Sequence, residues 1–308
     1  MTEKKGRVIN LNGGVYQVVL ESGELISIKA RGKLRNVKVM GVHPKALSKK
    51  ESVLTLKLSP KVGDNVIVKQ DMISDVLPRK NELIRPDIAN VDQILLVFAA
   101  KEPTFSFYLL DLFIVNITKQ GIEPLLVVTK VDLLTEEELT SLKEKLGYYE
   151  KLGYSVLYVS SKKQEGLEEV ALKLKNKVTV LSGQTGAGKS SLINALIPGF
   201  ELHTQDISQA LGRGKHTTRQ TTLYPYLGGY IGDTPGFSKL NVLGIEKKEL
   251  ADLFLEFHAY DCKFKDCMHQ ENALGCGVFH AYLEHQILDT RYESYLKMLT
   301  QIKELEKK

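Results

Sequence analysis

One motif dominates this sequence of 308 residues, the run Gly183-Gln184-Thr185-Gly186-Ala187-Gly188-Lys189-Ser190. Residues 177–182 precede it as a short, largely apolar run that predicts a buried strand, and residues 191–196 follow it with helical character. A strand, a glycine-rich loop ending in Gly-Lys-Ser and a helix form the context of a P-loop. In such a loop, backbone N–H groups bind phosphate oxygens at the positive end of the helix. The motif therefore predicts a binding site for a nucleoside triphosphate.

The residues of this loop have distinct expected roles. Lys189 is expected to reach the β- and γ-phosphates and to act in catalysis, and the Ser190 hydroxyl is expected to hold Mg²⁺. A glycine-rich turn formed by chance is the alternative, but the complete spacing and both flanks argue against it. The predicted phosphate-binding residues are Gly183, Gln184, Thr185, Gly186, Ala187, Gly188, Lys189, Ser190 and Ser191.

The composition is that of a soluble globular protein, with 43% hydrophobic and 26% charged residues. The length favours two or three domains. No uncharged apolar run approaches the roughly 18 residues that a membrane span needs. The N-terminus leads into a polar strand and not into the apolar core of a signal peptide. We therefore expect a cytoplasmic protein that does not contact membranes.

Charge is distributed unevenly along the chain. Residues 1–70 contain 14 Lys or Arg and 5 Asp or Glu, a net charge of +9, so the remainder must carry −4 to give the overall +5. A basic segment beside a mildly acidic remainder favours a polyanionic partner, with nucleic acid as the first candidate. Solvated surface lysines are the alternative explanation.

The same basic segment contains short runs of alternating residues at 15–20, 25–28, 37–40 and 62–68, separated by turns. Short strands at this spacing predict a five-stranded β-barrel such as an OB-fold. Because Tyr16 is the only aromatic residue available for stacking there, contacts to the backbone and shape of RNA are more consistent than base-specific recognition. The predicted RNA-binding residues are Lys29, Arg31, Lys33, Arg35 and Lys38.

Beyond a polar linker at residues 78–81, strands and helices alternate. Such alternation predicts a doubly wound sheet, which the P-loop strand joins as its fourth member. A capping box at residues 135–138 marks the start of one helix. The predicted strands are residues 94–100, 125–128 and 154–159, and the predicted helices are residues 106–120, a segment from 135 onward, and 166–175.

Two of the loops that follow these strands carry residues suited to reading a base. Ligands of such sheets lie beyond the carboxyl ends of the strands. Thr129-Lys130-Val131-Asp132 resembles the Asn-Lys-x-Asp motif of GTPases, and Ser160-Ser161-Lys162 resembles their Ser-Ala-Lys loop. The Asp132 carboxylate can accept hydrogen bonds from guanine N1–H and the 2-amino group, whereas adenine offers neither donor. The sequence therefore predicts GTP, with Thr129, Lys130, Asp132, Ser160, Ser161 and Lys162 around the base.

Two further motifs follow the P-loop. Asp233-Thr234-Pro235-Gly236 matches the Asp-x-x-Gly switch, in which Asp233 holds Mg²⁺ through water and the Gly236 N–H senses the γ-phosphate. Residues 212–219 resemble the first switch of translation-factor-like GTPases, in which a threonine completes the Mg²⁺ shell. Thr218 is favoured over Thr217 for that role.

Phe237 stands immediately after the switch glycine, where Ras-type GTPases have glutamine. Phenylalanine cannot orient the attacking water, so we expect slow intrinsic hydrolysis, with the missing group supplied by His216 or by a partner. A solvated loop histidine is the alternative for His216. Both base motifs precede the P-loop, which indicates circular permutation and brings the second switch next to the C-terminal segment. We hypothesise that the nucleotide state moves that segment.

All three cysteines lie in the run Cys262-x4-Cys267-x-His269-x6-Cys276. Three thiols and one imidazole this close predict a tetrahedral structural zinc site with all four positions filled. The alternative fourth ligands are His258, His280 and His285. Because residues 241–308 contain little apolar material, we expect the metal to supply much of their folding energy. Residues 280–308 predict one polar helix, whose packed side carries Tyr292, Tyr295, Leu296 and Leu299.

A basic barrel, a permuted GTPase and this zinc module resemble the RsgA (YjeQ/YloQ) family of ribosome-assembly GTPases over essentially the whole chain. Residues 77–81, 88–93 and 214–218 also match. Thr129 departs from the usual asparagine, and the last spacing of the zinc motif is one residue longer. The resemblance implies a multidomain fold of three parts: an OB-fold RNA-binding domain (1–75), a circularly permuted P-loop GTPase domain (76–240) and an α-rich zinc-binding domain (241–308).

The resemblance also implies a function. It is that of a slow GTPase, converting GTP to GDP and phosphate with Mg²⁺, stimulated by the small ribosomal subunit, assisting its late maturation and releasing an assembly factor. The barrel and the zinc module are expected to contact ribosomal RNA, and the protein is expected to be a monomer. An RNA-binding switch with incidental turnover is the second hypothesis. A P-loop kinase or ATPase is the third, and the Asp132 loop argues against it.

Overall fold

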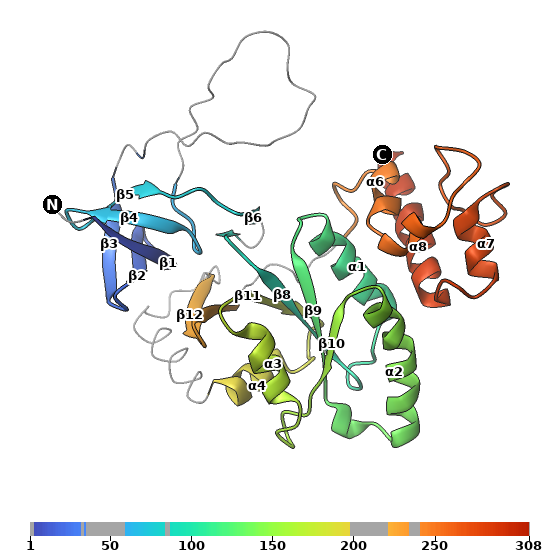
Figure 1. The fold of residues 1–308 in the computed structure, drawn as a ribbon, viewed down its shortest axis with the longest axis horizontal. Helices are drawn as coiled ribbons and strands as arrows, with labels where there is room; N and C mark the ends of the chain where they lie inside the picture. The colour runs from blue at the N-terminus through green and yellow to red at the C-terminus, as the bar shows by residue number, and fades with distance from the viewer. Residues whose placement is uncertain are drawn as a thin grey trace, which may run out of the picture. The chain divides into compact units, whose positions relative to one another are not determined.

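The computed structural model describes residues 3–31, 34, 59–83, 87–197, 221–233 and 241–307 (Figure 1). The chain divides into two compact units, the first running from the N-terminus to Val91 with a short part of residues 221–233, the second beginning at Asp92. The predicted boundaries after residues 75 and 240 remain predictions. No helix in these described ranges is long and apolar enough to cross a membrane.

The N-terminal strands form a closed barrel of five strands in the order β1-β2-β3-β5-β4, which confirms the predicted OB-like barrel. All neighbours pair antiparallel except β3 and β5, which pair parallel. The barrel core is apolar, with Val8, Val18, Val66 and Ile73 fully buried. The strands are β1 (Lys4–Asn12), β2 (Val15–Leu20), β3 (Leu25–Ala30), β4 (Asn65–Lys69) and β5 (Met72–Val76).

The sequence did not predict β5, and the predicted strand at residues 37–40 lies outside the described residues. The turn between β4 and β5 explains why β5 was not predicted. Gln70 and Asp71 adopt φ values of 52° and 54°, as the central residues of a type I′ hairpin do. Such turns usually contain Asn or Gly, so this hairpin carries no turn signal in its sequence.

The segment after the barrel, predicted as a linker, is pinned by hydrogen bonds. Arg79 donates through Nε and Nη2 to the two carboxylate oxygens of Asp64, at 2.8 Å each, and Asp64 is fully buried. Asn81 exchanges two hydrogen bonds with the backbone of Val91, at 2.7 and 2.9 Å. These contacts give residues 77–81 a structural role. Two short antiparallel strands also lie here, β6 (Glu82–Leu83) and β7 (Ile88–Ala89).

The central sheet has six strands in the order β10-β9-β8-β11-β13-β12, two more than predicted. The four predicted strands pair parallel. Strand β12 could not be predicted because Pro225 interrupts its pattern, but proline is tolerated at a sheet edge, where β12 lies. The strands are β8 (Gln93–Ala99), β9 (Glu123–Thr129), β10 (Ser155–Tyr158), β11 (Val178–Gly183), β12 (Thr222–Tyr226) and β13 (Gly229–Asp233).

Helices connect the parallel strands: α1 (Phe107–Thr118), α2 (Glu136–Lys151), α3 (Leu167–Leu174) and α4 (Lys189–Leu196). The chain moves outward from β8 to β10 and then returns to β11. Right-handed crossovers therefore place α1 and α2 on one face of the sheet and α3 on the other (Figure 1). The predicted capping box is confirmed, since Thr135 and Glu138 cap each other's backbone N–H at the start of α2.

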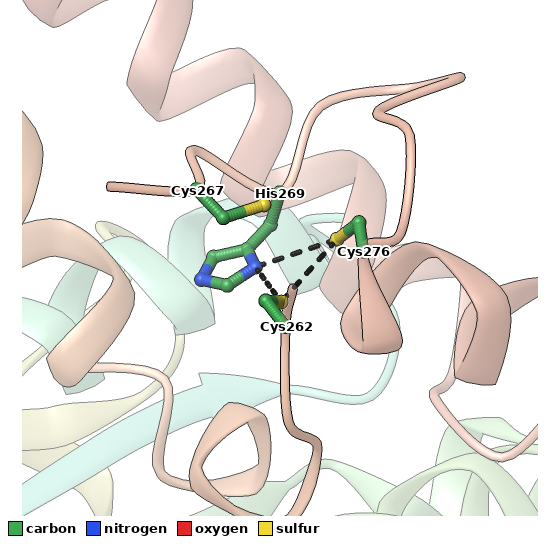
Figure 2. A group of neighbouring side chains, drawn as sticks. All are labelled: Cys262, Cys267, His269 and Cys276. Atoms are coloured by element: carbon green, nitrogen blue, oxygen red, sulfur yellow. Dashed lines mark hydrogen bonds between the residues drawn. The ribbon is translucent and has the colours of Figure 1, made fainter. Parts of the chain in front are cut away.

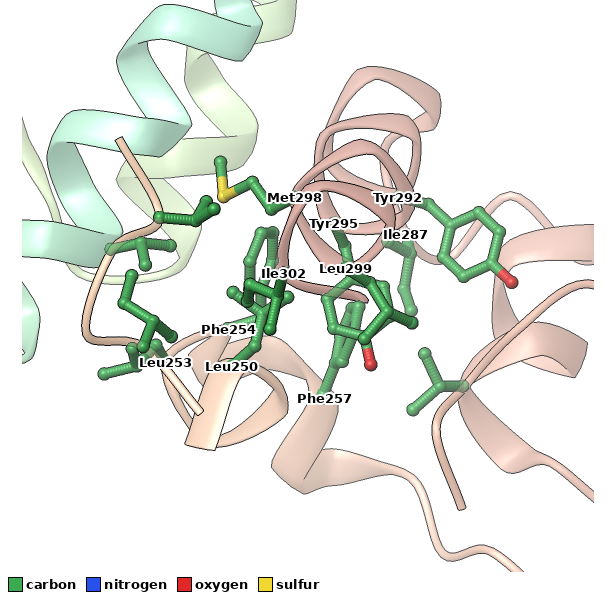
Figure 3. Close-up of a cluster of buried hydrophobic side chains, with 14 of the residues drawn as sticks. Leu250, Leu253, Phe254, Phe257, Ile287, Tyr292, Tyr295, Met298, Leu299 and Ile302 are labelled. Atoms are coloured by element: carbon green, nitrogen blue, oxygen red, sulfur yellow. The ribbon is translucent and has the colours of Figure 1, made fainter. Parts of the chain in front are cut away.

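Residues 242–302 contribute most of a buried apolar core, which also includes Leu112 and Val115 of α1, so the expectation of little apolar material was wrong. Phe254, Phe257 and Tyr295 lie with ring centroids 4.9 to 5.3 Å apart, against further buried side chains from several elements (Figure 3). The C-terminal elements that contribute to this core are separated along the chain, so no single apolar period marks it. They are α6 (Lys247–Asp252), η3 (Leu255–Ala259), α7 (Gly277–Leu283) and α8 (Asp289–Glu306).

The predicted helix at residues 280–308 is therefore two helices. His285, with φ of 55°, lies in the break between α7 and α8. Of the predicted packed residues, Tyr292, Tyr295 and Leu299 are buried, whereas Leu296 is half-buried.

A buried ionic cluster joins α8 to the helices of the sheet. Arg291, fully buried, donates to both carboxylate oxygens of Glu256 at 2.7 and 2.9 Å and to Asp111 at 2.7 Å. The Tyr149 hydroxyl donates to the same Asp111 oxygen at 2.7 Å. Burial raises the pKa of Asp111 even though Arg291 opposes the shift. One guanidinium thus links α1, η3 and α8.

Candidate functional site

The P-loop connects the end of β11 to the start of α4. Gly183, the last residue of β11, has φ of 123°, and a Cβ there would lie 2.1 Å from the Val97 carbonyl oxygen. Only glycine fits this approach. The next residue, Gln184, donates its backbone N–H to the same carbonyl at 2.9 Å. The start of the P-loop is therefore hydrogen-bonded to β8, which lies between β9 and β11 in the sheet.

Lys189 extends back across this loop. Its ammonium lies 2.8 Å from the Gln184 carbonyl oxygen and 3.2 Å from that of Gly183. Ser190 and Ser191 follow in the first turn of α4, where the unpaired N–H groups and the helix dipole favour an anion. The loop thus presents a cation and a helix N-terminus on one side, as phosphate binding requires.

Asp132 lies in η1 (Val131–Leu133), directly after β9, and its carboxylate is already oriented. The Ser160 hydroxyl donates to Asp132 Oδ1 at 2.6 Å and accepts from the Lys163 N–H at 3.1 Å. Ser160 is fully buried. The hydrogen bond from Ser160, assisted by the charge of Lys162, lowers the pKa of Asp132. The carboxylate is therefore an ionised acceptor, as pairing with guanine N1–H and the 2-amino group requires.

Thr129 connects the base side to the phosphate side. Its hydroxyl lies 2.5 Å from the carbonyl oxygen of Ala187 in the P-loop and 3.2 Å from that of Phe98. The residue is only 2% exposed. The last residue of β9 is therefore hydrogen-bonded directly to the phosphate-binding loop.

These elements enclose a pocket of about 240 Å³. Seven of the predicted nucleotide-binding residues line it. Leu133 also lines it and was not predicted; its side chain is 39% exposed. Its position directly after Asp132 is the sequence signal that could have identified it. The lining residues are Thr129, Lys130, Asp132, Leu133, Ser161, Lys162, Gly188 and Ser191.

Several predicted residues cannot be placed. His216, Thr217, Thr218 and Gly236 lie outside the described residues, and Asp233 ends β13 with its side chain outside the described part.

The same limit applies to the predicted RNA-binding residues of the barrel. Lys29 lies on β3, and both it and Arg31 are exposed. Lys33, Arg35 and Lys38 lie outside the described residues.

The four predicted zinc ligands converge in the C-terminal domain. The thiol sulfurs of Cys262, Cys267 and Cys276 and a ring nitrogen of His269 all lie within 4.8 Å of one another (Figure 2). Nδ1 of His269 is 3.5 Å from the sulfurs of Cys262 and Cys276, which are 3.8 Å apart. His258, His280 and His285 are not part of this group.

These separations fit a tetrahedral zinc ion. With Zn–S of about 2.3 Å and Zn–N of about 2.0 Å, tetrahedral geometry puts two sulfurs about 3.8 Å apart and sulfur and nitrogen about 3.5 Å apart. Helix α8 positions the loop, since Tyr292 donates to the His269 carbonyl at 2.8 Å and Tyr295 to that of Met268 at 2.9 Å. The donor set and its supports are compatible with a structural zinc site.

A model of the RsgA GTPase family matches residues 76–243. The chain belongs to the RsgA GTPase family. It is 41% identical over 306 residues to the small ribosomal subunit biogenesis GTPase RsgA of Halalkalibacterium halodurans, covering 97% of each chain. It is 39% identical over 308 residues to the protein of the same name from Onion yellows phytoplasma, covering 97% of this chain and 98% of that protein.

Solved structures agree with this membership of the RsgA family. YjeQ from Thermotoga maritima matches with a TM-score of 0.79 and 34% identity over 98% of this chain and 99% of its own. YloQ, described as a circularly permuted GTPase, matches with a TM-score of 0.77 and 32% identity over 99% and 96%. The predicted family and the permuted GTPase fold are confirmed, and the chain is a GTP-hydrolysing enzyme.

Proposed function

We propose that this RsgA-family GTPase acts in late maturation of the small ribosomal subunit, that its slow turnover is stimulated by that subunit, and that it promotes release of an assembly factor. The observation that carries the proposal is identity of about 40% over nearly the full length to proteins named small ribosomal subunit biogenesis GTPase. The pocket beside the P-loop supports the GTP-binding part of this proposal, because a carboxylate held by Ser160 suits guanine.

In the proposed site, Asp132 binds the Watson–Crick edge of guanine, and Ser161 and Lys162 flank it. The backbone of residues 183–188 and the Lys189 ammonium bind the phosphates, and Lys189 neutralises charge that develops on them during hydrolysis. Mg²⁺, when bound with GTP, would supply further positive charge against the same phosphates. Its proposed protein ligands are Ser190, Thr218 and Asp233.

The proposed catalytic step lacks one common component. Phe237 follows the switch glycine, so no glutamine there orients the attacking water. We assign that role to His216, or to a group that the ribosomal subunit brings on docking, with the Gly236 N–H contacting the γ-phosphate. Such an arrangement gives slow hydrolysis in the free protein and faster hydrolysis on the subunit.

Contacts to ribosomal RNA are assigned to the basic barrel and the zinc domain. Lys29 and Arg31 are exposed on the barrel, within a segment of net charge +9. Phosphate contacts of this kind would make subunit binding weaken as salt rises. Zinc holds the loop of Cys262, Cys267, His269 and Cys276 in shape. The protein is proposed to work in the cytoplasm as a monomer.

The experiment is GTP turnover with and without purified small subunits, with ATP in parallel. The proposal predicts a slow rate with GTP alone that rises sharply on adding subunits, and no comparable turnover of ATP. His216→Ala is expected to lose the stimulated rate while retaining GTP binding. An unchanged stimulated rate in this variant would refute the role of His216.

A second candidate function is an RNA-binding switch in which GTP is only a conformational ligand. Phe237 favours it, because the residue cannot assist hydrolysis. Tight GTP-dependent binding to the subunit without any stimulation of turnover would support this switch over the first proposal. Equal competition by ATP and GTP would instead support the kinase or ATPase alternative.

A further inference from the structure

Thr129 stands at the position where Asn-Lys-x-Asp motifs have asparagine, and its surroundings define what it can do. It ends β9, is 2% exposed and lines the nucleotide pocket. Its hydroxyl lies between two backbone carbonyls, that of Ala187 at 2.5 Å and that of Phe98 at 3.2 Å. Both partners are acceptors, and both belong to other segments of the sheet or its loops.

A threonine hydroxyl has a single hydrogen to donate. Here that hydrogen is used on the Ala187 carbonyl, the nearer of the two acceptors. The side chain therefore has no donor left for a ligand. An asparagine amide has two hydrogens, and could donate one to the P-loop and the other to a base.

Guanine presents two kinds of hydrogen-bonding group. N1–H and the 2-amino group donate, whereas O6 and N7 accept. The Asp132 carboxylate matches the donors, and Ser160 already holds it in place. N7 needs a protein donor, and the Thr129 hydroxyl, whose only hydrogen is used on the Ala187 carbonyl, does not offer one.

We propose that Thr129 is a positioning residue that fastens the P-loop to β9 and does not read the base, so that this GTPase recognises guanine without using N7. The proposal rests on the guanine site described under Proposed function. In this proposal Thr129 affects GTP binding through its hydrogen bond to the Ala187 carbonyl and not through contact with the guanine ring.

The substitutions at this position separate the two roles. Thr129→Val keeps the shape but leaves the buried Ala187 carbonyl unpaired, so GTP and 7-deaza-GTP should both bind about tenfold more weakly, with their ratio unchanged. Thr129→Asn adds a donor, so it should favour GTP over 7-deaza-GTP by roughly three- to tenfold. Thr129→Ser keeps the hydroxyl and should behave as the wild type.

The test is equilibrium competition of nucleotides against a fluorescent GDP on the full chain with zinc and Mg²⁺. GTP, 7-deaza-GTP, inosine triphosphate and ATP are compared. For the wild type, GTP and 7-deaza-GTP should agree within about twofold, because losing N7 removes no hydrogen bond. Inosine triphosphate, which lacks the 2-amino group, should bind about tenfold or more weakly, because one carboxylate oxygen loses its partner.

The ratio of 7-deaza-GTP to GTP is insensitive to a general loss of stability, which would move both affinities together. A wild-type penalty of threefold or more for 7-deaza-GTP, with GTP still preferred over ATP, would overturn the proposal for Thr129 alone. Equal binding of ATP and GTP would overturn it together with the assignment of Asp132. An unchanged ratio in Thr129→Asn would also contradict it, because the added donor would then not reach N7.

Discussion

The nucleotide pocket and the zinc cluster hold their functional atoms in different ways. In the pocket, hydroxyls and N–H groups of the chain pair with carbonyls and a carboxylate, as Ser160 does with Asp132 and Thr129 with Ala187. In the cluster, three sulfurs and an imidazole nitrogen face one another within 4.8 Å. The pocket therefore pairs hydrogen-bond donors with acceptors, whereas the cluster brings together four atoms that can all act as ligands of a metal cation.

Without metal, two thiols of the cluster differ in how readily they ionise. Burial, with the neighbouring Cys267 thiol, raises the pKa of Cys276 to about 12. Burial acts in the same direction on Cys262, but the N–H groups of Val278 and Gly277 outweigh it and lower that pKa. A metal ligand must be a thiolate, so binding zinc releases protons and supplies what the chain cannot. The groups that orient Asp132 and Thr129 belong to the chain itself, so we infer that the shape of the pocket is independent of zinc.

Outside the cluster, the C-terminal residues from 241 onward are held, like the sheet, by contacts within the chain. The aromatic core packs α8 against η3 (Figure 3). The Arg291 ion pairs join α8 to η3 and to α1. Metal removal should therefore disorder the loop of residues 262–276 without releasing α8.

Removal of zinc is expected to have the largest effect. Structural zinc sites bind with roughly 10 kcal/mol or more of free energy, which is lost with the ion. Hydrogen exchange of the full chain should show loss of protection across residues 262–276 after treatment with a zinc-selective chelator, or in Cys276→Ser. Helix α8 should stay protected. His280→Ala, which alters a histidine outside the cluster, is the matched control, and complete loss of protection in α8 would show that the metal holds the whole domain.

Breaking the buried ionic cluster should have the next largest effect. Arg291→Ala leaves two carboxylates buried without their partner, and is expected to lower the free energy of unfolding by about 3–5 kcal/mol. Denaturant unfolding measures the change. The control is Lys101→Ala, which removes the exposed ion pair of Lys101 with Glu138 and should give no measurable change. Equal effects of the two substitutions would mean that Arg291 is not a structural link.

Asp132→Asn tests the base side of the pocket. Replacing the acceptor carboxylate by an amide should weaken GTP binding by about 100-fold, because guanine then faces a donor where it needs an acceptor. Xanthosine triphosphate, whose 2-oxo group accepts, should bind the variant better than GTP does. Competition binding measures both. Glu136→Gln, four residues further along the chain in α2, is the control, and unchanged GTP affinity in Asp132→Asn would exclude a role in base recognition.

The smallest change in stability is expected at the start of α2, the helix that follows the Asp132 loop. Thr135→Ala removes the hydroxyl that accepts from the Glu138 N–H at 3.2 Å, and should destabilise the protein by about 1 kcal/mol. Thermal unfolding measures it. Thr140→Ala lies within the same helix, exposed, and alanine is the better helix former there. If this control destabilised as much as Thr135→Ala, the capping box would carry no special stability.

The features that could be predicted from sequence are local ones. The P-loop requires glycines at fixed positions, and Gly183 shows why: a Cβ there would collide with Val97. The parallel strands are continuous apolar runs because helices cover both of their faces. The predicted zinc ligands lie within 15 consecutive residues, from Cys262 to Cys276, so their spacing alone indicated the cluster.

The features that could not be predicted depend on residues distant in sequence. Nothing near Arg291 indicates that it pairs with Asp111, 180 residues earlier. The bond from Thr129 to the Ala187 carbonyl involves a backbone atom, which no sequence pattern marks. Hairpins without Asn or Gly at the first turn position, as at Gln70-Asp71, leave no local signal. The core around Phe254 was missed because its residues come from several elements that are separated along the chain, α1 among them.

The most direct test of the difference between the pocket and the cluster is the affinity of the full chain for GTP before and after zinc removal. Competition with fluorescent GDP, in Mg²⁺ buffer and with a zinc-selective chelator, gives both dissociation constants. A pocket preformed by the chain's own hydrogen bonds should keep its Kd for GTP within about twofold and its preference over ATP, since no partner of Asp132 or Thr129 is lost. A loss of tenfold or more would show that the pocket depends on the metal after all.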